Sequence, residues 1–336
     1  MQTSSPHIHA ENAVAIIMRK VLYALIPGIL LSTFFLGIGV LVNCLLAATF
    51  ALVFEASVLK IRQQAIRPVI TDGTAIITAI LFALTISPYT PWWVSFTGIA
   101  FAIVIAKHLF GGLGNNPFNP AMAGYVFVLL SFPVQMAYWP DLSGISEQTL
   151  TTGQNIGIIF SGLPTELDAI TGATPLTNMK IELGLMTMVS EIETNPLYGS
   201  FGGKGWEWIA LAYLAGGLFL IINKVIRWEI PLCVMGSIFV VSLLFNFIDT
   251  DVYPSAVFHL FTGGTMLCAF FIATDPASSS TTPKGKILYG VGVGLFIYII
   301  RTWGSYPDGI AFAILIMNGL VPLIDNYTRP KVLGKK

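Results

Sequence analysis

The stretch VLYALIPGILLSTFFLGIGVLVNCLLAATFALVFEASVL, residues 21–59, contains one acidic residue, Glu55, and no basic residue. A helix needs about 20 apolar residues to cross the hydrocarbon core of a bilayer. The stretch is almost twice as long as one span requires, so a tight helical hairpin fits it better than one tilted helix. It therefore predicts two membrane-spanning helices, 21–38 and 40–59, divided at Gly37-Ile38-Gly39.

The composition of the whole chain agrees with a membrane protein. Of its 336 residues, 55% are hydrophobic and 10% are charged, and the mean hydropathy is +0.78. About a quarter of the residues of a soluble domain are charged. We expect a lipid bilayer around this chain, and no nucleic acid as a partner.

Further apolar runs raise the predicted number of membrane-spanning helices to ten. The ten spans are 21–38, 40–59, 70–87, 92–110, 119–139, 206–223, 230–248, 255–274, 287–304 and 308–325. Residues 1–20 form a polar tail without a signal-peptide core, so the first span should be retained. Three isolated cysteines, Cys44, Cys233 and Cys268, are expected to be buried thiols, and no metal site is predicted.

The basic residues indicate the orientation of the chain. With a cytoplasmic N-terminus, 14 of the 17 Lys and Arg residues lie inside and three, Lys180, Lys204 and Arg301, lie outside. Such an excess marks the cytoplasmic side. Both termini are then cytoplasmic, and the long acidic segment 140–205 is extracytoplasmic.

This segment divides the chain into a tail with a first five-helix half, 1–139, and a second five-helix half with a C-terminal tail, 206–336. An odd number of spans per half predicts inverted halves. Asp72-Gly73-Thr74 and Gly263-Gly264-Thr265 both occur in the third span of their half, which favours broken helices there, or else ordinary glycine-mediated packing. The predicted fold is an all-α polytopic membrane protein with a long extracytoplasmic loop.

The loop contains the motif Asp168-Ala169-Ile170-Thr171-Gly172-Ala173-Thr174. It matches the pattern Asp-x-x-Ser/Thr-Gly-Ala-Thr that a flavin transferase recognises when it links FMN to a threonine through a phosphoester. From average residue usage, such a match arises by chance in roughly one chain of this length in a thousand. We therefore predict FMN on Thr174, making the chain a phosphoprotein, with Asp168, Thr171, Gly172 and Ala173 as the recognition site. The alternative is a glycine-containing turn with solvated hydroxyl groups.

Several polar residues within or beside the spans are candidates for flavin or ion-path contacts, because such residues are costly in a membrane and often functional. The four that we single out are Asp72, Gly112, Asn119 and Asp275. Asp72 and Asp275 could equally pair with nearby Lys or Arg residues. The remaining expectations are that Glu55 and Lys107 extend to the cytoplasmic surface, that Arg301 anchors a span end, and that His108 and His259 are packed side chains or proton carriers.

Over nearly its whole length the chain resembles the D-type membrane protein of the Rnf (or Rsx) electron-transport complex, which is related to the B-type protein of the sodium-pumping NADH:quinone oxidoreductase. The resemblance lies in Lys107-His108-Leu109-Phe110-Gly111-Gly112-Leu113-Gly114, Asn119-Pro120-Ala121, Thr171-Gly172-Ala173-Thr174 and Ala273-Thr274-Asp275-Pro276. It implies a translocase component of the bacterial inner membrane that is not catalytic alone. That component would relay electrons between ferredoxin- or NADH-side centres and membrane centres while Na⁺ or H⁺ moves.

The resemblance also implies partners and cofactors. The partners are the A-, B-, C-, E- and G-type proteins of the Rnf complex and the flavin transferase, and the cofactors are FMN on Thr174 and a second, non-covalent flavin such as riboflavin. The competing hypothesis is a passive channel or transporter for small polar solutes, because Asn119-Pro120-Ala121 is similar to the half-helix motif of aquaporins. That hypothesis leaves the Thr174 motif unexplained.

Overall fold

The first two spans form the predicted hairpin. In the computed structural model, which describes residues 11–112, 114–142, 151–162 and 171–329, α1 (Glu11–Leu36) is followed by α2 (Gly39–Ile61). Gly37 has a φ of 95°, a conformation that glycine adopts without steric cost. The predicted start of the first span at residue 21 was wrong, because α1 begins inside the tail that we expected to be polar.

The other elements of the described chain are mostly helices. In order they are α3 (Ile66–Ile70), α4 (Thr74–Thr85), α5 (Trp92–Ala100), the π-helix η1 (Phe101–Leu109), α6 (Pro120–Ser131), α7 (Pro133–Ala137), β1 (Trp139–Pro140), α8 (Thr152–Ser161), β2 (Thr171–Gly172), α9 (Pro175–Gly184), α10 (Val189–Ile192), α11 (Trp206–Ile222), α12 (Glu229–Ile248), α13 (Ala256–Phe261), α14 (Thr265–Leu267), the π-helix η3 (Cys268–Ile272), α15 (Pro283–Trp303) and α16 (Ile310–Thr328). The two short strands pair antiparallel.

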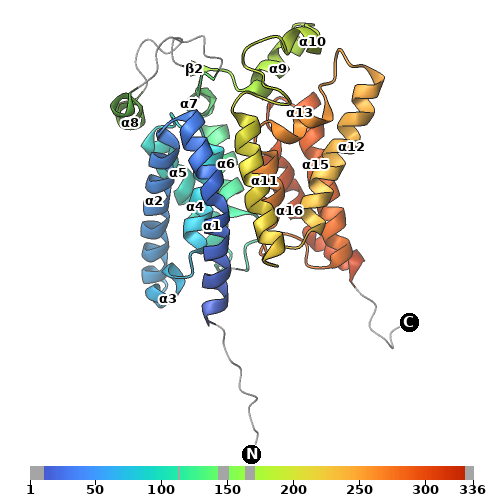
Figure 1. Cartoon of the computed structure of the whole chain (residues 1–336). Helices are drawn as coiled ribbons and strands as arrows, with labels where there is room; N and C mark the ends of the chain where they lie inside the picture. Colours follow the sequence, from blue (N-terminus) through green and yellow to red (C-terminus); the bar gives the residue numbers. More distant parts are fainter. Residues whose placement is uncertain (1–10, 113, 143–150, 163–170, 330–336) are drawn as a thin grey trace, which may run out of the picture.

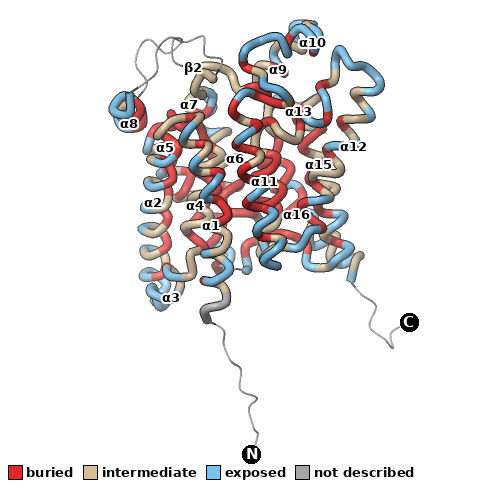
Figure 2. Tube along the Cα trace, viewed as in Figure 1, coloured by how far each residue is buried: buried red, intermediate tan, exposed pale blue. Residues whose placement is uncertain are grey.

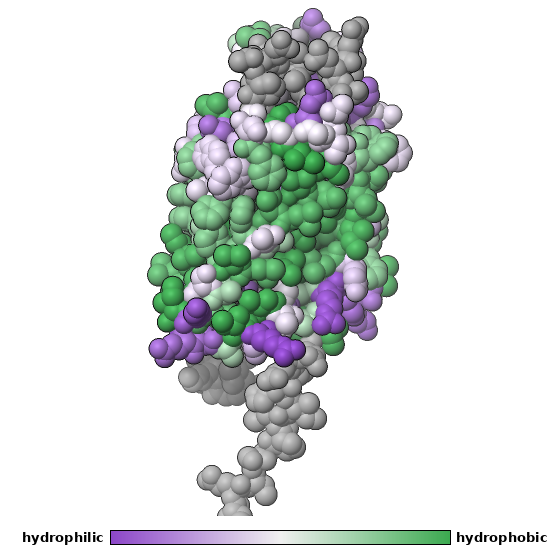
Figure 3. Space-filling view, turned by 90° about the vertical axis from the view of Figure 1, so that its left-hand side faces the viewer, coloured by the Kyte–Doolittle hydropathy of each residue, from purple (hydrophilic) through white to green (hydrophobic). Residues whose placement is uncertain are grey.

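The polytopic all-α class is confirmed. Among the described residues, six helical segments are long and apolar enough to cross a membrane, and α4, α6 and α11 are shorter apolar helices. Figure 3 shows a broad hydrophobic band across one face of the molecule, with hydrophilic residues towards its two ends. Such a band suits the hydrocarbon core of a bilayer.

Three of the ten predicted spans are interrupted. The run 70–87 contains a helix only from Thr74, because Gly73 has a φ of 82° and ends the preceding turn. The run 119–139 is divided into α6 and α7 at Phe132, directly before Pro133. The run 255–274 is divided into α13, α14 and η3, with Gly263 at a φ of 72°. Hydropathy does not detect these breaks, since the residues at them lie within apolar runs.

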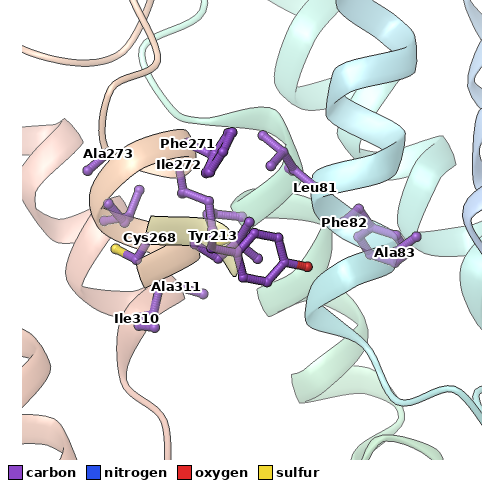
Figure 4. Close-up of a cluster of buried hydrophobic side chains, with 14 of the residues drawn as sticks. Leu81, Phe82, Ala83, Tyr213, Cys268, Phe271, Ile272, Ala273, Ile310 and Ala311 are labelled. Atoms are coloured by element: carbon purple, nitrogen blue, oxygen red, sulfur yellow. The ribbon is translucent and has the colours of Figure 1, made fainter. Parts of the chain in front are cut away.

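The first and last described helices reach the same end of the bundle (Figure 1). Figure 1 shows α1 beginning and α16 ending at one end of the bundle, with β2, α9 and α10 at the opposite end. Buried residues gather in the middle of the bundle, while α2 and α12 carry exposed residues along their outer sides (Figure 2). In the core, Tyr213 of α11 lies between Leu81, Phe82 and Ala83 of α4 and Phe271 and Ile272 of η3 (Figure 4).

Candidate functional site

Thr174 is the N-cap residue of α9, the ten-residue helix of the outer loop. Its side-chain oxygen accepts a hydrogen bond from the Thr177 backbone amide at 3.2 Å and lies 2.8 Å from the Thr177 hydroxyl oxygen. Pro175 occupies the first helical position, where its missing N–H costs nothing. Thr174 is half-buried, so its hydroxyl lies at a helix N-terminus, where backbone amides and the helix dipole favour a negative group.

The segment before Thr174 is attached to the first half of the chain. Thr171 pairs with Pro140 and Gly172 pairs with Trp139, at the end of the fifth predicted span. A Cβ atom on Gly172 would lie 3.2 Å from Asp141, so the small residue of the motif permits this close pairing. The predicted recognition residue Asp168 lies outside the described residues, whereas Thr171, Gly172, Ala173 and Thr174 are contiguous in the structure.

Helix α9 is held against the second half of the chain. The Lys180 ammonium group donates to the carbonyl oxygen of Arg301 at 2.8 Å and lies 3.4 Å from those of Ile300 and Tyr306. These carbonyls lie at and beyond the C-terminal turn of α15, where a cation is favourable. Burial lowers the pKa of Lys180. Leu176 and Met179 of α9 pack in a small core with Phe258 of α13.

Tyr198 supports the first turn of α9 from the far side of the loop. Its hydroxyl lies 2.8 Å from the Asn178 side-chain oxygen and 3.3 Å from the Pro175 carbonyl oxygen, and donates to this pair. Burial, and then the carboxylates of Glu193 and Glu182, raise the pKa of Tyr198. The phenol therefore stays neutral and remains a donor, and the position of Thr174 is fixed by contacts on both sides.

A second candidate site is a cavity of about 430 Å³ at the opposite end of the bundle. Pockets of about 300–1,000 Å³ are the usual size for a small organic ligand. One part of its wall is apolar, and the other part carries hydroxyl, amide and charged side chains. The polar lining residues are Thr74, Thr78, Lys107, Asn116, Asn119, Arg227, Thr274, Asp275, Ser279, Ser280, Thr281 and Lys286.

Asn119 joins the two halves beside this cavity. It caps α6 by accepting from the Met122 amide at 3.2 Å, and its side-chain nitrogen donates to the Ile272 carbonyl oxygen at 3.2 Å. Its backbone amide donates to the side-chain oxygen of Asn318 at 3.0 Å, and Asn318 donates in turn to Ser278 and Tyr289. A buried network with its hydrogen bonds made specifies one arrangement of its helices.

The four residues that the sequence singled out for flavin or ion-path contacts do not all meet. Asn119 and Asp275 line the cavity, whereas Asp72 and Gly112 are not among its lining residues. Asp72 accepts hydrogen bonds from the amide and hydroxyl of Thr74, and Asp275 accepts from the Ser278 hydroxyl at 2.7 Å. Neither carboxylate has a salt-bridge partner among the described residues, so the alternative of pairing with Lys or Arg was wrong.

Two expectations about intramembrane charges were also wrong. Glu55 and Lys107 do not extend to the surface: they are 0% and 2% exposed and form an ion pair with each other at 2.5 Å. Arg301 is more than a span-end anchor, because it is buried, pairs with Asp308 at 3.0 Å and donates to the His259 carbonyl oxygen.

For His108 and His259 the sequence left two roles, a packed side chain or a proton carrier. The structure places these two histidines in different surroundings. His108 lies 3.3 Å from a carboxylate oxygen of Glu55, whereas neither ring nitrogen of buried His259 has a hydrogen-bond partner in the described chain. Sequence reasoning missed Thr74, Asn116 and Asn318 as polar groups of the interior. An asparagine within the apolar run 308–325 was the available signal for Asn318.

These observations define a polytopic membrane protein with a partly polar cavity towards one end and an ordered, hydroxyl-bearing helix cap at the other. The model of the NQR2, RnfD, RnfE family matches residues 1–334. The chain belongs to this family.

Its relatives are similar over their full length. The chain is 45% identical to the D component of the ion-translocating oxidoreductase complex of Aliivibrio salmonicida, over 99% of this chain and 98% of that protein. The proteins of the same name from Aeromonas hydrophila and Vibrio vulnificus are also 45% identical, with at least 98% of each chain covered.

Proposed function

We propose that this chain is the D-type membrane component of an Rnf-type ion-translocating oxidoreductase complex. Its function would be to relay electrons between ferredoxin- or NADH-side centres and membrane redox centres while the complex moves Na⁺ or H⁺. The family and the names of its relatives support the type of complex. The Thr174 motif, held in an ordered helix cap, is the observation that carries the redox role.

The residues present fit a covalent FMN on Thr174. The phosphoester would lie at the N-terminus of α9, where the helix dipole and the backbone amides of the first turn favour its negative charge. The contacts of Lys180 and Tyr198 hold the helix in one position. The flavin supplies the redox chemistry, and the protein supplies position and charge.

The cavity fits the second, non-covalent flavin. Its volume suits a tricyclic ring, its apolar wall includes Leu81 and Phe270, and Thr74, Asn119 and Asp275 offer hydrogen-bonding groups. The two flavins would then lie towards opposite membrane surfaces. This arrangement suits a chain that carries electrons across the bilayer.

The proposed setting is the bacterial inner membrane, with both termini in the cytoplasm and loop 140–205 outside. The A-, B-, C-, E- and G-type proteins of the complex would supply the neighbouring redox centres, and a flavin transferase would modify the loop. The fourteen-to-three distribution of Lys and Arg supports this orientation.

Flavin fluorescence of the denatured protein tests the covalent link. Protein from a host that has the transferase should give a fluorescent gel band, and Thr174→Ala should abolish it. Thr187→Ala, which changes another threonine of the same loop, should leave the fluorescence unchanged. A colourless wild-type band would contradict the proposal.

Extraction tests the second flavin. Denaturation should release about one non-covalent flavin per chain, and Thr78→Phe, which places a ring in the cavity, should remove it while the covalent flavin stays. Thr78→Ser should retain both. Release of the same flavin from Thr78→Phe would exclude this cavity.

The competing proposal of a passive channel is less well supported. In an aquaporin-like role the asparagine side chain of Asn119-Pro120-Ala121 would have to be free for solutes. Here the Asn119 side chain binds Met122 and Ile272. Solute flux through liposomes containing flavin-free Thr174→Ala protein would favour the channel.

A further inference from the structure

A buried ion pair forms part of the wall of the cavity. Nζ of Lys107, in η1, lies 2.5 Å from Oε1 of Glu55, in α2, and donates to the Thr74 hydroxyl at 2.9 Å. Lys107 and Thr74 both line the cavity, whereas Glu55 does not. The ammonium group is therefore bonded both to a buried carboxylate and to the hydroxyl of Thr74, a residue that lines the space where a ligand would bind.

The surroundings of this pair suggest a role beyond stability. Burying two charges costs several kcal/mol per ion even when they are paired, and well-packed apolar residues often stabilise a protein equally well. One oxygen of Glu55, Oε2, has no hydrogen-bond partner among the residues that the structure describes, and the imidazole of His108 lies 3.3 Å from the other. Within the described part of the chain, the carboxylate is thus bonded to Lys107 and His108 through one oxygen only.

Other charged groups of the cavity differ from Lys107. Lys286 is only partly buried, and Arg227 is largely exposed and pairs with Glu229 at 2.5 Å. Solvent screens both. Asp275 is the carboxylate that lines the cavity, and it opposes negative charge on a ligand. Lys107, at 2% exposure, is therefore the most deeply buried of the cations that line the cavity, and solvent screens its charge least.

We propose that Lys107 sets the midpoint potential of the flavin in this cavity. Its ammonium group stabilises the negative charge that the ring gains on reduction, and the negative charge of Glu55 weakens this stabilisation. This inference rests on the non-covalent flavin of the proposed function. A neutral flavin that accepts two electrons and one proton becomes an anionic hydroquinone. The electrons come from a one-electron donor such as an iron–sulfur centre, and the proton comes from solvent.

The proposal predicts opposite effects for the two partners. Lys107→Met removes the cation and should lower the midpoint potential of the non-covalent flavin. Glu55→Gln removes the opposing anion and should raise it. A tenfold change in the relative affinity for the reduced and oxidised flavin corresponds to about 30 mV for a two-electron couple, and we expect shifts of at least tenfold. General damage to the fold would not move the potential in opposite directions.

The experiment is a redox titration of the full complex in detergent, with dithionite as reductant. The covalent flavin at the other end of the chain is the internal reference and should not shift. Lys60→Met, which removes an exposed cation of the same helix as Glu55, should leave both potentials unchanged. Lys107→Arg should keep the potential close to that of the wild type.

Folding is controlled with a double variant. If Lys107→Met does not accumulate because Glu55 is left unpaired, Glu55→Gln/Lys107→Met removes both charges, and its potential should lie below the wild-type value and below that of Glu55→Gln alone. A bound flavin whose potential is the same in all variants would overturn the role of Lys107 and leave the cavity assignment standing. A wild-type complex without non-covalent flavin would overturn both.

Discussion

At the scale of single residues, the position of Thr174 depends on a close contact made by a glycine. A Cβ atom on Gly203 would lie 2.3 Å from Cγ of Pro175, the residue that follows Thr174. The backbone amide of Gly203 also donates to the Thr262 hydroxyl at 3.2 Å, which fixes it from the other side. A proline ring cannot rotate away, so even one methyl group here displaces the start of α9.

We therefore expect Gly203→Ala to reduce the fraction of chains that carry covalent flavin and to destabilise the loop by about 1–3 kcal/mol, the usual cost of overpacking. The measurement is in-gel flavin fluorescence divided by the protein stain. Gly184→Ala is the matched control, because a Cβ atom there meets nothing within 4 Å and alanine is the better helix former. Equal flavin content in the two variants would show that the contact does not position Thr174.

At the scale of elements, the sequence predicted helices well and their interruptions poorly. The hairpin of α1 and α2 divides where Gly37-Ile38-Gly39 suggested, because the apolar tract was too long for one span. The run 255–274 was expected to be one span and is three helical pieces. Thr265 of this run, for example, donates to the His259 carbonyl oxygen within the protein. Hydropathy averages over such local contacts.

The start of α4 gives a prediction at this scale. One oxygen of Asp72 accepts from the Thr74 amide at 2.7 Å and from the Thr74 hydroxyl at 2.6 Å. Asp72→Ala should lower the melting temperature, with a cost of about 0.5–2 kcal/mol for a lost cap. Asp72→Asn keeps an acceptor oxygen and should melt close to the wild type. If ion transport fails equally in both variants, the negative charge of Asp72, rather than its hydrogen bonds to Thr74, is required for transport.

At the scale of the whole molecule, the opposite placement of the loop and the termini can be tested in cells. In a variant without its three native cysteines, Ser190→Cys of the outer loop should react with a membrane-impermeant maleimide added to spheroplasts. Lys284→Cys, exposed in the first turn of α15 at the other end, should react only after lysis. The reverse pattern would contradict the predicted orientation.

A fourth prediction concerns the network between the halves. Asn318 is 1% exposed and joins Asn119 to Ser278 and Tyr289. Asn318→Ala should cost about 1–3 kcal/mol, because it leaves buried polar groups without partners. Thermal unfolding in detergent measures this loss, and Asn326→Ala, an exposed asparagine of the same helix, serves as the control. An unchanged melting temperature for Asn318→Ala would show that the network contributes little.

The two candidate sites differed in how far the sequence could predict them. The Thr174 motif is local, so adjacent residues sufficed to locate it in the loop. The Glu55–Lys107 pair joins residues that are 52 positions apart. No spacing rule relates two such positions. Taken separately, each residue was predicted to extend from the end of a span to the cytoplasmic surface. Only the packing of α2 against η1 brings them together.

The π-helix η1 has a consequence for how this pair is built. Lys107 and His108 are neighbours in sequence, yet both approach the same oxygen of Glu55. A π-helix bonds residues five apart rather than four, so it has more residues per turn than an α-helix and turns less between neighbours. Removing a single residue upstream, such as Val104, would restore the shorter repeat and rotate both side chains away from the carboxylate. In this part of the chain, the number of residues counts as much as their identity.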